Sequence, residues 1–171
     1  MRIFHIQSST VTESADIDAL ATSGPPAQRY IWVACAREEL ESSLGKVQSM
    51  LQSLGGVQLV DLHVSDLLNQ QLPSHYDYTS QYDMLVFRRL AAGNGSTPGT
   101  GQTGTRIPAK GGPPILRRID TSPVGFVVLD RVLLTVHPTD CAAREAYAAK
   151  LLQAASAESR AAGARLPTSP A

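Results

Sequence analysis

Several features that define large classes of protein are scarce in this chain. Among its 171 residues there are two cysteines, one tryptophan and 5% aromatic residues, and fifteen basic side chains balance fifteen acidic ones. A net charge of zero gives no overall field that would attract nucleic acid, so we do not expect nucleic acid as a partner. Cys35 and Cys141 lie far apart and in no metal-binding spacing, which argues against a disulfide scaffold and favours a reducing compartment.

Long hydrophobic runs are also lacking. None approaches the ~20 apolar residues that a membrane-spanning helix needs, and the N-terminus turns polar too early for a signal peptide. With 43% hydrophobic residues the chain can nevertheless bury the core of one ordinary domain. We therefore predict a single soluble domain over residues 1–165.

Hydrophobic periodicity predicts alternating strands and helices. Strands are predicted over residues 2–6, 30–35, 57–60, 84–90, 115–119, 124–129 and 132–136, and helices over 13–20, 40–54, 64–70 and 140–161. The clearest helix carries one apolar stripe and ends at two glycines; the stripe consists of Leu40, Leu44, Val47, Leu51 and Leu54. The strands on either side of this helix indicate a βαβ unit, and Asp130-Arg131 indicates a tight antiparallel turn. The predicted fold class is α/β: a mixed sheet of about seven strands with helices packed on both faces, an α/β/α sandwich.

Residues 91–114 form a dense mixture of Gly, Thr and Pro, which predicts a flexible loop inside the domain. Within it, residues 99–104 match the GxGxxG pattern of dinucleotide sites. In such a site the glycines directly follow a strand and open a helix. Here the predicted strand ends near Leu90 and no helix can readily begin after residue 104, so a loop is favoured. The alternative, a small soluble α/β enzyme or nucleotide-binding domain that uses this loop as a lid, stays open.

Candidate metal ligands and nucleophiles are few. His63 and Asp66 stand one helical turn apart and could share a metal ion, but two ligands at one spacing are a weak signal. An exposed, hydrogen-bonded pair is the favoured interpretation, and His75 and Asp77 are interpreted as part of a polar loop. Cys141 has no histidine in a recognisable relation to it. We therefore assign no catalytic or cofactor-binding residue and predict that the chain is not an enzyme.

Four segments, taken in order, carry a resemblance to a known family. They are residues 30–33 (Tyr-Ile-Trp-Val), 65–69 (Ser-Asp-Leu-Leu-Asn) with Pro73 after them, 82–87 (Tyr-Asp-Met-Leu-Val-Phe), and 124–137, which end in Leu-Thr-Val-His. Over roughly residues 30–160 the chain resembles the N-terminal cytoplasmic domain of CorA-type magnesium transporters, including the zinc-transporting ZntB branch.

The resemblance implies a cytoplasmic regulatory, ion-sensing domain of a CorA-like magnesium or divalent metal ion transporter of the inner membrane. Such a transporter is a homopentamer, and Mg²⁺ bound between neighbouring subunits holds its closed state. Asp66 matches the family's short-helix aspartate, which is a metal ligand, and the partner carboxylate belongs to a neighbour's stalk. Zn²⁺ and Co²⁺ are alternatives to Mg²⁺ in the full-length protein, and the chain alone would require no cofactor.

Two departures from the family pattern modify these expectations. Ser65 stands where the family has an acid before the aspartate, which predicts a weaker or altered site. The pore-forming helices and the Gly-Met-Asn motif are missing. We therefore expect residues 166–171 to lead into a stalk, and any membrane contact to be made only through C-terminal helices beyond this chain.

Overall fold

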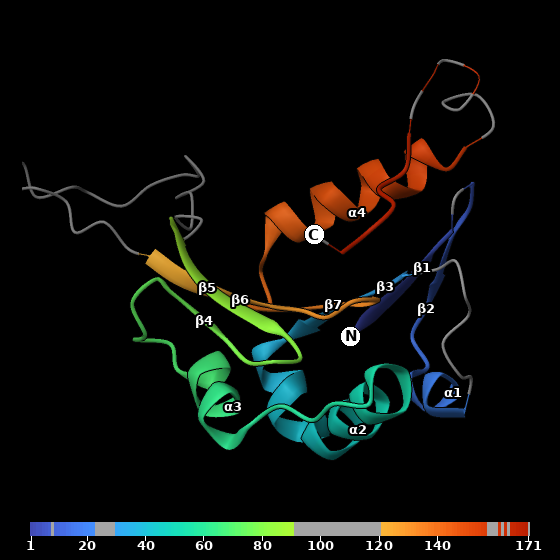
Figure 1. The fold of residues 1–171 in the computed structure, drawn as a ribbon. Helices are drawn as coiled ribbons and strands as arrows, with labels where there is room; N and C mark the ends of the chain where they lie inside the picture. The colour runs from blue at the N-terminus through green and yellow to red at the C-terminus, as the bar shows by residue number, and fades with distance from the viewer. Residues whose placement is uncertain are drawn as a thin grey trace, which may run out of the picture.

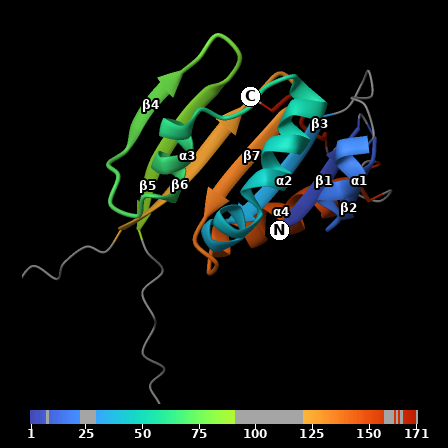
Figure 2. The ribbon, with the colours of Figure 1, turned by 90° about the horizontal axis from the view of Figure 1, so that it is seen from below.

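A seven-stranded mixed sheet forms the centre of the molecule (Figure 1). The computed structural model describes residues 1–7, 9–22, 30–90, 121–156, 161, 163 and 165–170. The strand order is β2-β1-β3-β7-β6-β5-β4, as Figure 2 shows. β3 and β7 are parallel, and the other neighbouring strands are antiparallel. The strands are β1 (Arg2–Ile6), β2 (Val11–Ser14), β3 (Tyr30–Ala36), β4 (His75–Tyr78), β5 (Asp83–Leu90), β6 (Thr121–Val128) and β7 (Val132–His137).

Helices cover the two faces of this sheet unequally (Figure 1). On one face, here called the α2 face, lie α1 (Ile17–Thr22), α2 (Arg37–Gly55) and α3 (Asp61–Leu68). On the other, the α4 face, the described residues supply one helix, α4 (Ala142–Ala154). The predicted α/β/α sandwich is therefore confirmed. None of the helices in the described ranges is both long and apolar enough to cross a membrane.

The apolar stripe of α2 anchors the larger core on the α2 face. Leu40, Val47 and Leu51 are fully buried and belong to one cluster with residues of β3 and β7. The helix ends as the glycine pair predicts: Gly56 adopts φ 68°, and its N–H donates to the carbonyl oxygen of Gln52. A positive φ costs glycine little because it has no Cβ atom, so this position fixes the end of the helix.

A second, smaller cluster lies beneath α4. The ring of Phe4 stacks on that of Trp32 with 4.7 Å between centroids, and Ala148 and Leu151 of α4 pack in the same cluster. Leu166 is also buried there. The residues expected to lead into a stalk therefore begin against the body of this domain.

The strand predicted over residues 57–60 is wrong, and so is the βαβ unit built on it. This segment connects α2 to α3 without entering the sheet, and the parallel neighbour of β3 is β7. The side-chain amide of Gln48 donates to the Leu59 carbonyl at 2.9 Å and accepts from the Leu59 N–H at 2.8 Å. One side chain thus satisfies both backbone groups that a neighbouring strand would otherwise bind.

The remaining differences from the predictions concern mainly the edge strands of the sheet. β2 and β4 lie at the two edges of the sheet and are polar and half-exposed, so they lack the apolar run that marks a buried strand. The helical turn predicted within residues 13–20 is present as α1, although Glu13 and Ser14 belong to β2. The hairpin at Asp130-Arg131 is confirmed by the antiparallel β6–β7 pair. The predicted strand 115–119 and the predicted loop 91–114 lie outside the described residues.

Candidate functional site

Asp66, the predicted metal ligand, lies on α3 and faces the edge strand β4. Its carboxylate Oδ2 is 3.8 Å from Nε2 of His75, and its side chain is 19% exposed. Val64 and Leu67 on the same helix are buried against the sheet, which fixes the side of α3 that turns outward. Asp66 is therefore a half-buried carboxylate beside a histidine, rather than a freely solvated group on a helix face.

His63 does not pair with Asp66, and the predicted exposed pair is wrong. The imidazole is only 3% exposed. Its Nδ1 lies 2.8 Å from the Tyr82 hydroxyl and its Nε2 lies 3.2 Å from Oδ2 of Asp77. Both ring nitrogens are thus engaged, so a metal ion could be bound only by breaking one of these contacts.

The partners of His63 favour one arrangement of protons. The Tyr82 oxygen accepts a hydrogen bond from the Val60 N–H at 3.1 Å, which leaves its own O–H to donate to Nδ1 of His63. Nε2–H then donates to Asp77. The bond from His63, together with the Tyr78 N–H, lowers the pKa of the Asp77 carboxyl. Asp77 is therefore ionised at neutral pH, and its carboxylate accepts the hydrogen bond that orients His63.

The described residues form no complete metal site at α3. Within the described ranges, no three His, Cys, Asp or Glu side chains come together as a group that could hold a metal ion. Asp66 and His75 supply two potential ligands, of which only the carboxylate suits a hard cation. Mg²⁺ keeps several waters and is commonly held by one or two carboxylates, so Asp66 has the chemistry of a Mg²⁺ ligand.

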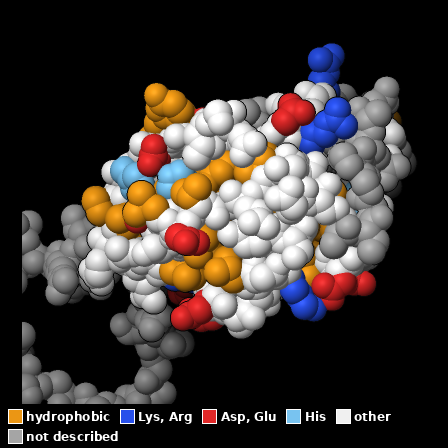
Figure 3. All heavy atoms as spheres, turned by 60° about the horizontal axis from the view of Figure 1, so that its bottom comes forward, with side chains coloured by type: hydrophobic (Ala, Val, Ile, Leu, Met, Phe, Trp, Pro, Cys, Tyr) orange, Lys and Arg blue, Asp and Glu red, His pale blue; other side chains and the backbone are white. Residues whose placement is uncertain are grey.

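The surface around Asp66 combines histidine, acidic and hydrophobic side chains. Figure 3 shows these three types close together at the α3–β4 end of the molecule. Val60 and Leu62, at the start of α3, are large apolar residues with exposed side chains. Exposed apolar groups beside acidic ones are common at surfaces that bind other proteins.

The contacts of His63 and Asp66 were missed because they come from β4 and the turn after it. The sequence predicts a polar loop there, whereas His75–Tyr78 is a strand whose register with β5 places His75 opposite Val86. Tyr76 and Tyr78 alternate with polar residues, and this period-two pattern of β-prone residues was the available signal.

Solved structures share this fold, although no family model and no curated protein matches the chain. The full-length CmaX protein aligns with a TM-score of 0.59 and 12% identity, over 99% of this chain and 41% of that one. The ZntB cytoplasmic domain from Vibrio parahaemolyticus RIMD 2210633 aligns with a TM-score of 0.56 and 12% identity, over 99% and 52%. The CorA magnesium transporter from Methanocaldococcus jannaschii gives a TM-score of 0.48 at 16% identity, over 90% and 37%. The fold assignment rests on the first two.

At these identities the likeness concerns the fold. The chain has the fold of the ZntB cytoplasmic domain along nearly its whole length, so the resemblance to the cytoplasmic domain of CorA-type transporters is confirmed in architecture. The chain spans about half or less of the length of the structures that it matches.

Proposed function

We propose that this chain is a cytoplasmic, ion-sensing domain of a CorA-like divalent metal ion transporter and that it acts by binding rather than by catalysis. The observation that carries the proposal is the fold shared with the ZntB cytoplasmic domain over 99% of the chain. The ordered sequence segments point to the same family by a separate route, since they do not depend on the shape of the backbone. In this proposal the full-length protein is a homopentamer of the inner membrane.

Asp66 is the proposed sensing residue. It would bind Mg²⁺, or Zn²⁺ or Co²⁺ in its place, together with a carboxylate of a neighbouring copy. Two carboxylates that approach across an interface repel one another unless a cation lies between them, so loss of the ion would loosen the closed assembly. The exposed Val60 and Leu62 beside Asp66 support a contact surface here. Ser65 is exposed and uncharged, so the acid that the family pattern has before the aspartate is absent here and the proposed site is weaker or altered.

Calorimetric titration of the chain with MgCl₂ tests this role. A single carboxylate should give weak binding, with a dissociation constant of roughly 1 mM or higher. Asp66→Asn should abolish the residual binding. Asp61→Asn is the matched control, because Asp61 is an exposed carboxylate in the first turn of the same helix, and it should leave binding unchanged. A tight stoichiometric site, or equal effects of the two variants, would refute the proposed site.

A further inference from the structure

An apolar groove, here called the α4 groove, runs along β5 and β6 beside α4 on the α4 face. Its deepest part is a pocket of about 290 Å³ with almost wholly apolar walls. The pocket is lined by Phe87 of β5, Phe126 of β6 and Tyr147 of α4, together with the buried Trp32. The groove is separate from the α3 surface, which lies on the opposite face of the sheet.

The apolar surface continues from the pocket to the edge of the sheet. Phe87 is 55% exposed, and Leu85, which lies two residues earlier on the same strand and therefore on the same face, is 41% exposed. Tyr76 of the edge strand β4 lies opposite Leu85, and its ring stacks on that of Tyr78 with 6.1 Å between centroids. Both tyrosines are exposed. A contiguous exposed strip of large apolar side chains is typical of a surface that binds another molecule.

The same strands are covered by a helix on their other face. There the buried Leu67 of α3 lies so close to Gly125 of β6 that a Cβ atom on the glycine would be 2.2 Å from Cδ2 of the leucine. On the α4 face, α4 lies over the part of the sheet formed by β1 and β3, and no other helix in the described ranges covers β4, β5 and β6 (Figure 1). Three strands about 4.8 Å apart are about as wide as one helix with its side chains. The uncovered surface therefore has the width of a single helix.

A helix fits this groove better than the sheet of a second copy would. α4 stands out from the sheet directly beside the pocket, which Ala143 and Tyr147 of this helix line (Figure 1). Two sheets pack face to face at about 10 Å, which is about the diameter of a helix, so a flat sheet would meet α4 before it could close on Phe87. A helix along β5 meets no such obstacle. Two helices side by side over one sheet is the arrangement that α2 and α3 already have on the other face (Figure 2).

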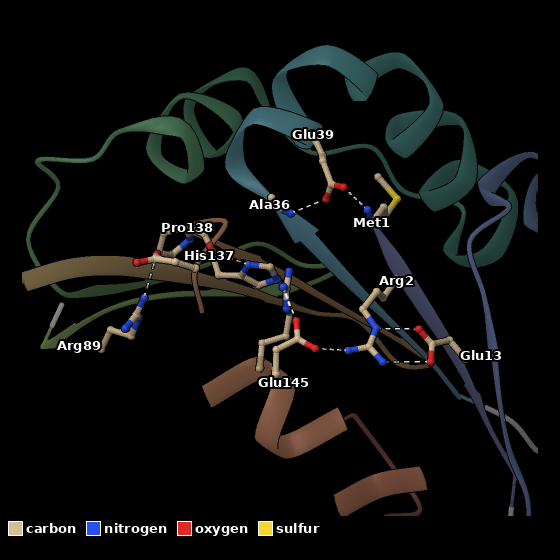
Figure 4. A network of polar contacts seen from close by, with 11 residues as sticks. Met1, Arg2, Glu13, Ala36, Glu39, Arg89, His137, Pro138 and Glu145 are labelled. Atoms are coloured by element: carbon tan, nitrogen blue, oxygen red, sulfur yellow. Dashed lines mark hydrogen bonds and ion pairs between the residues drawn. The ribbon is translucent and has the colours of Figure 1, made fainter. Parts of the chain in front are cut away.

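The side of the groove at the edge of the sheet favours a cationic flank on the bound helix. Asp83 is exposed on the face of β5 that forms the groove, and its carboxylate accepts a hydrogen bond from the Tyr76 hydroxyl at 3.0 Å. The exposed rings of Tyr76 and Tyr78 can each take a cation over their faces. Arg89, at the other end of β5, is mostly buried and lies 3.8 Å from Asp140, so its charge is compensated within this chain (Figure 4). A lysine or arginine beside β4 would therefore be attracted by both the carboxylate and the rings.

We propose that the α4 groove binds an amphipathic α-helix of a partner protein. The apolar stripe of this helix packs against Phe87 and Phe126, and one of its large apolar side chains enters the pocket. Its lysine or arginine flank faces Asp83 and the tyrosines of β4. This is the helix-in-groove mode of recognition, in which apolar side chains three and four residues apart supply the anchors. The assignment goes beyond the ion-sensing role and does not depend on Asp66.

Trp32 is the single tryptophan of the chain, so its fluorescence reports on the pocket. The probe is an acetylated peptide of about 14 residues, with leucines at helical spacing and lysines elsewhere, which is about 21 Å long as a helix. It should change the Trp32 emission saturably and bind about tenfold or more tightly than two controls, a peptide of the same composition with scrambled order and one with glutamate for lysine. Phe87→Ser should weaken binding by about tenfold or more. The matched control is Leu90→Ser, which changes an exposed residue of the same strand on its other face and should leave binding unchanged.

Several results would overturn the assignment. Equal binding of the scrambled peptide would show that no helical stripe is recognised, and equal binding of the glutamate peptide would contradict the cationic flank, as would an Asp83→Asn variant that keeps the full preference for lysine. Equal losses in Phe87→Ser and Leu90→Ser, or no saturable change in emission, would also refute it. Sedimentation that shows the chain alone to be a dimer, dissociated by Phe87→Ser, would mean that a second copy occupies the groove. If circular dichroism shows that Phe87→Ser is unfolded, Leu85→Ser serves the same purpose.

Discussion

Buried polar groups on the two faces of the sheet differ in how completely they are hydrogen-bonded. On the α2 face, Arg37 is 6% exposed and donates to the carbonyl oxygens of Leu67 at 3.2 Å and Pro123 at 2.8 Å. Gln48 and His63 on that face are likewise fully engaged by protein atoms. On the α4 face, Arg89, His137 and Arg144 each keep a buried nitrogen without a partner. The polar groups of the α2 face therefore hold the fold together, whereas these three nitrogen atoms of the α4 face add no hydrogen bond to it.

The largest effect should come from replacing Arg37 with Met. This change leaves two buried carbonyl groups without a hydrogen-bond donor and should lower the free energy of unfolding by about 2–4 kcal/mol. Arg144→Met removes a buried donor that is unpaired and should cost less than about 1 kcal/mol. Urea denaturation of both variants measures the contrast. An equal loss of stability in the two variants would contradict the proposed difference between the two faces.

Gly125 tests how closely the α2 face is packed. A Cβ atom there would lie 2.2 Å from Cδ2 of Leu67, which is itself buried. Gly125→Ala should therefore lower the free energy of unfolding by about 1–3 kcal/mol through overpacking. The matched control is Gly45→Ala in α2, where a Cβ meets nothing within 4 Å, and this variant should gain about 0.5–1 kcal/mol. An unchanged free energy of unfolding in Gly125→Ala would mean that α3 packs less tightly on the sheet than described.

The pH dependence of stability should separate His137 from the carboxylates. Burial lowers the pKa of His137, so the unfolded chain binds the extra proton first, and the free energy of unfolding should fall as the pH drops below about 6.5. The loss per pH unit is at most about 1.4 kcal/mol for one group. The lowered pKa of Asp77 acts in a different window, since that contribution disappears only below about pH 4. Thermal unfolding of His137→Gln should show a flatter dependence of stability on pH between about pH 7 and 5. An unchanged dependence would contradict the lowered pKa of His137.

The smallest effect should follow replacement of Asp66 with Asn. Its carboxylate makes one long contact, 3.8 Å to His75, at a half-exposed position. Ion pairs of this kind contribute little, so the free energy of unfolding should change by less than about 0.5 kcal/mol. A large drop in melting temperature would show that Asp66 is a structural residue of α3 and would weaken its proposed sensing role.

Sequence reasoning succeeded where one element contains its own signal. The stripe and terminal glycines of α2, the continuous apolar run of β3 and the turn at Asp130-Arg131 were all predicted and are all present. It failed at residues 57–60, because nothing in an alternating apolar pattern shows that the amide of Gln48 will replace a neighbouring strand. It also failed at β4, whose outward-facing tyrosines resemble a polar loop.

The α3 surface around Asp66 and the pocket on the α4 face also differ in how much of each is visible in a single segment of sequence. Asp66 could be named in advance because a family pattern covers its own short segment. The partners that surround it on β4 could not be named from that segment. The pocket on the α4 face is lined by residues from β3, β5, β6, β7 and α4, which meet only when the sheet is formed.

Paramagnetic mapping tests the central claim, that this domain senses a divalent cation through Asp66, most directly. Mn²⁺ at roughly millimolar concentration should broaden the amide NMR signals of α3 and β4 around Asp66 before any others, and Asp66→Asn should abolish this broadening while Asp61→Asn preserves it. Broadening centred on another part of the molecule, or identical spectra for the two variants, would contradict the claim.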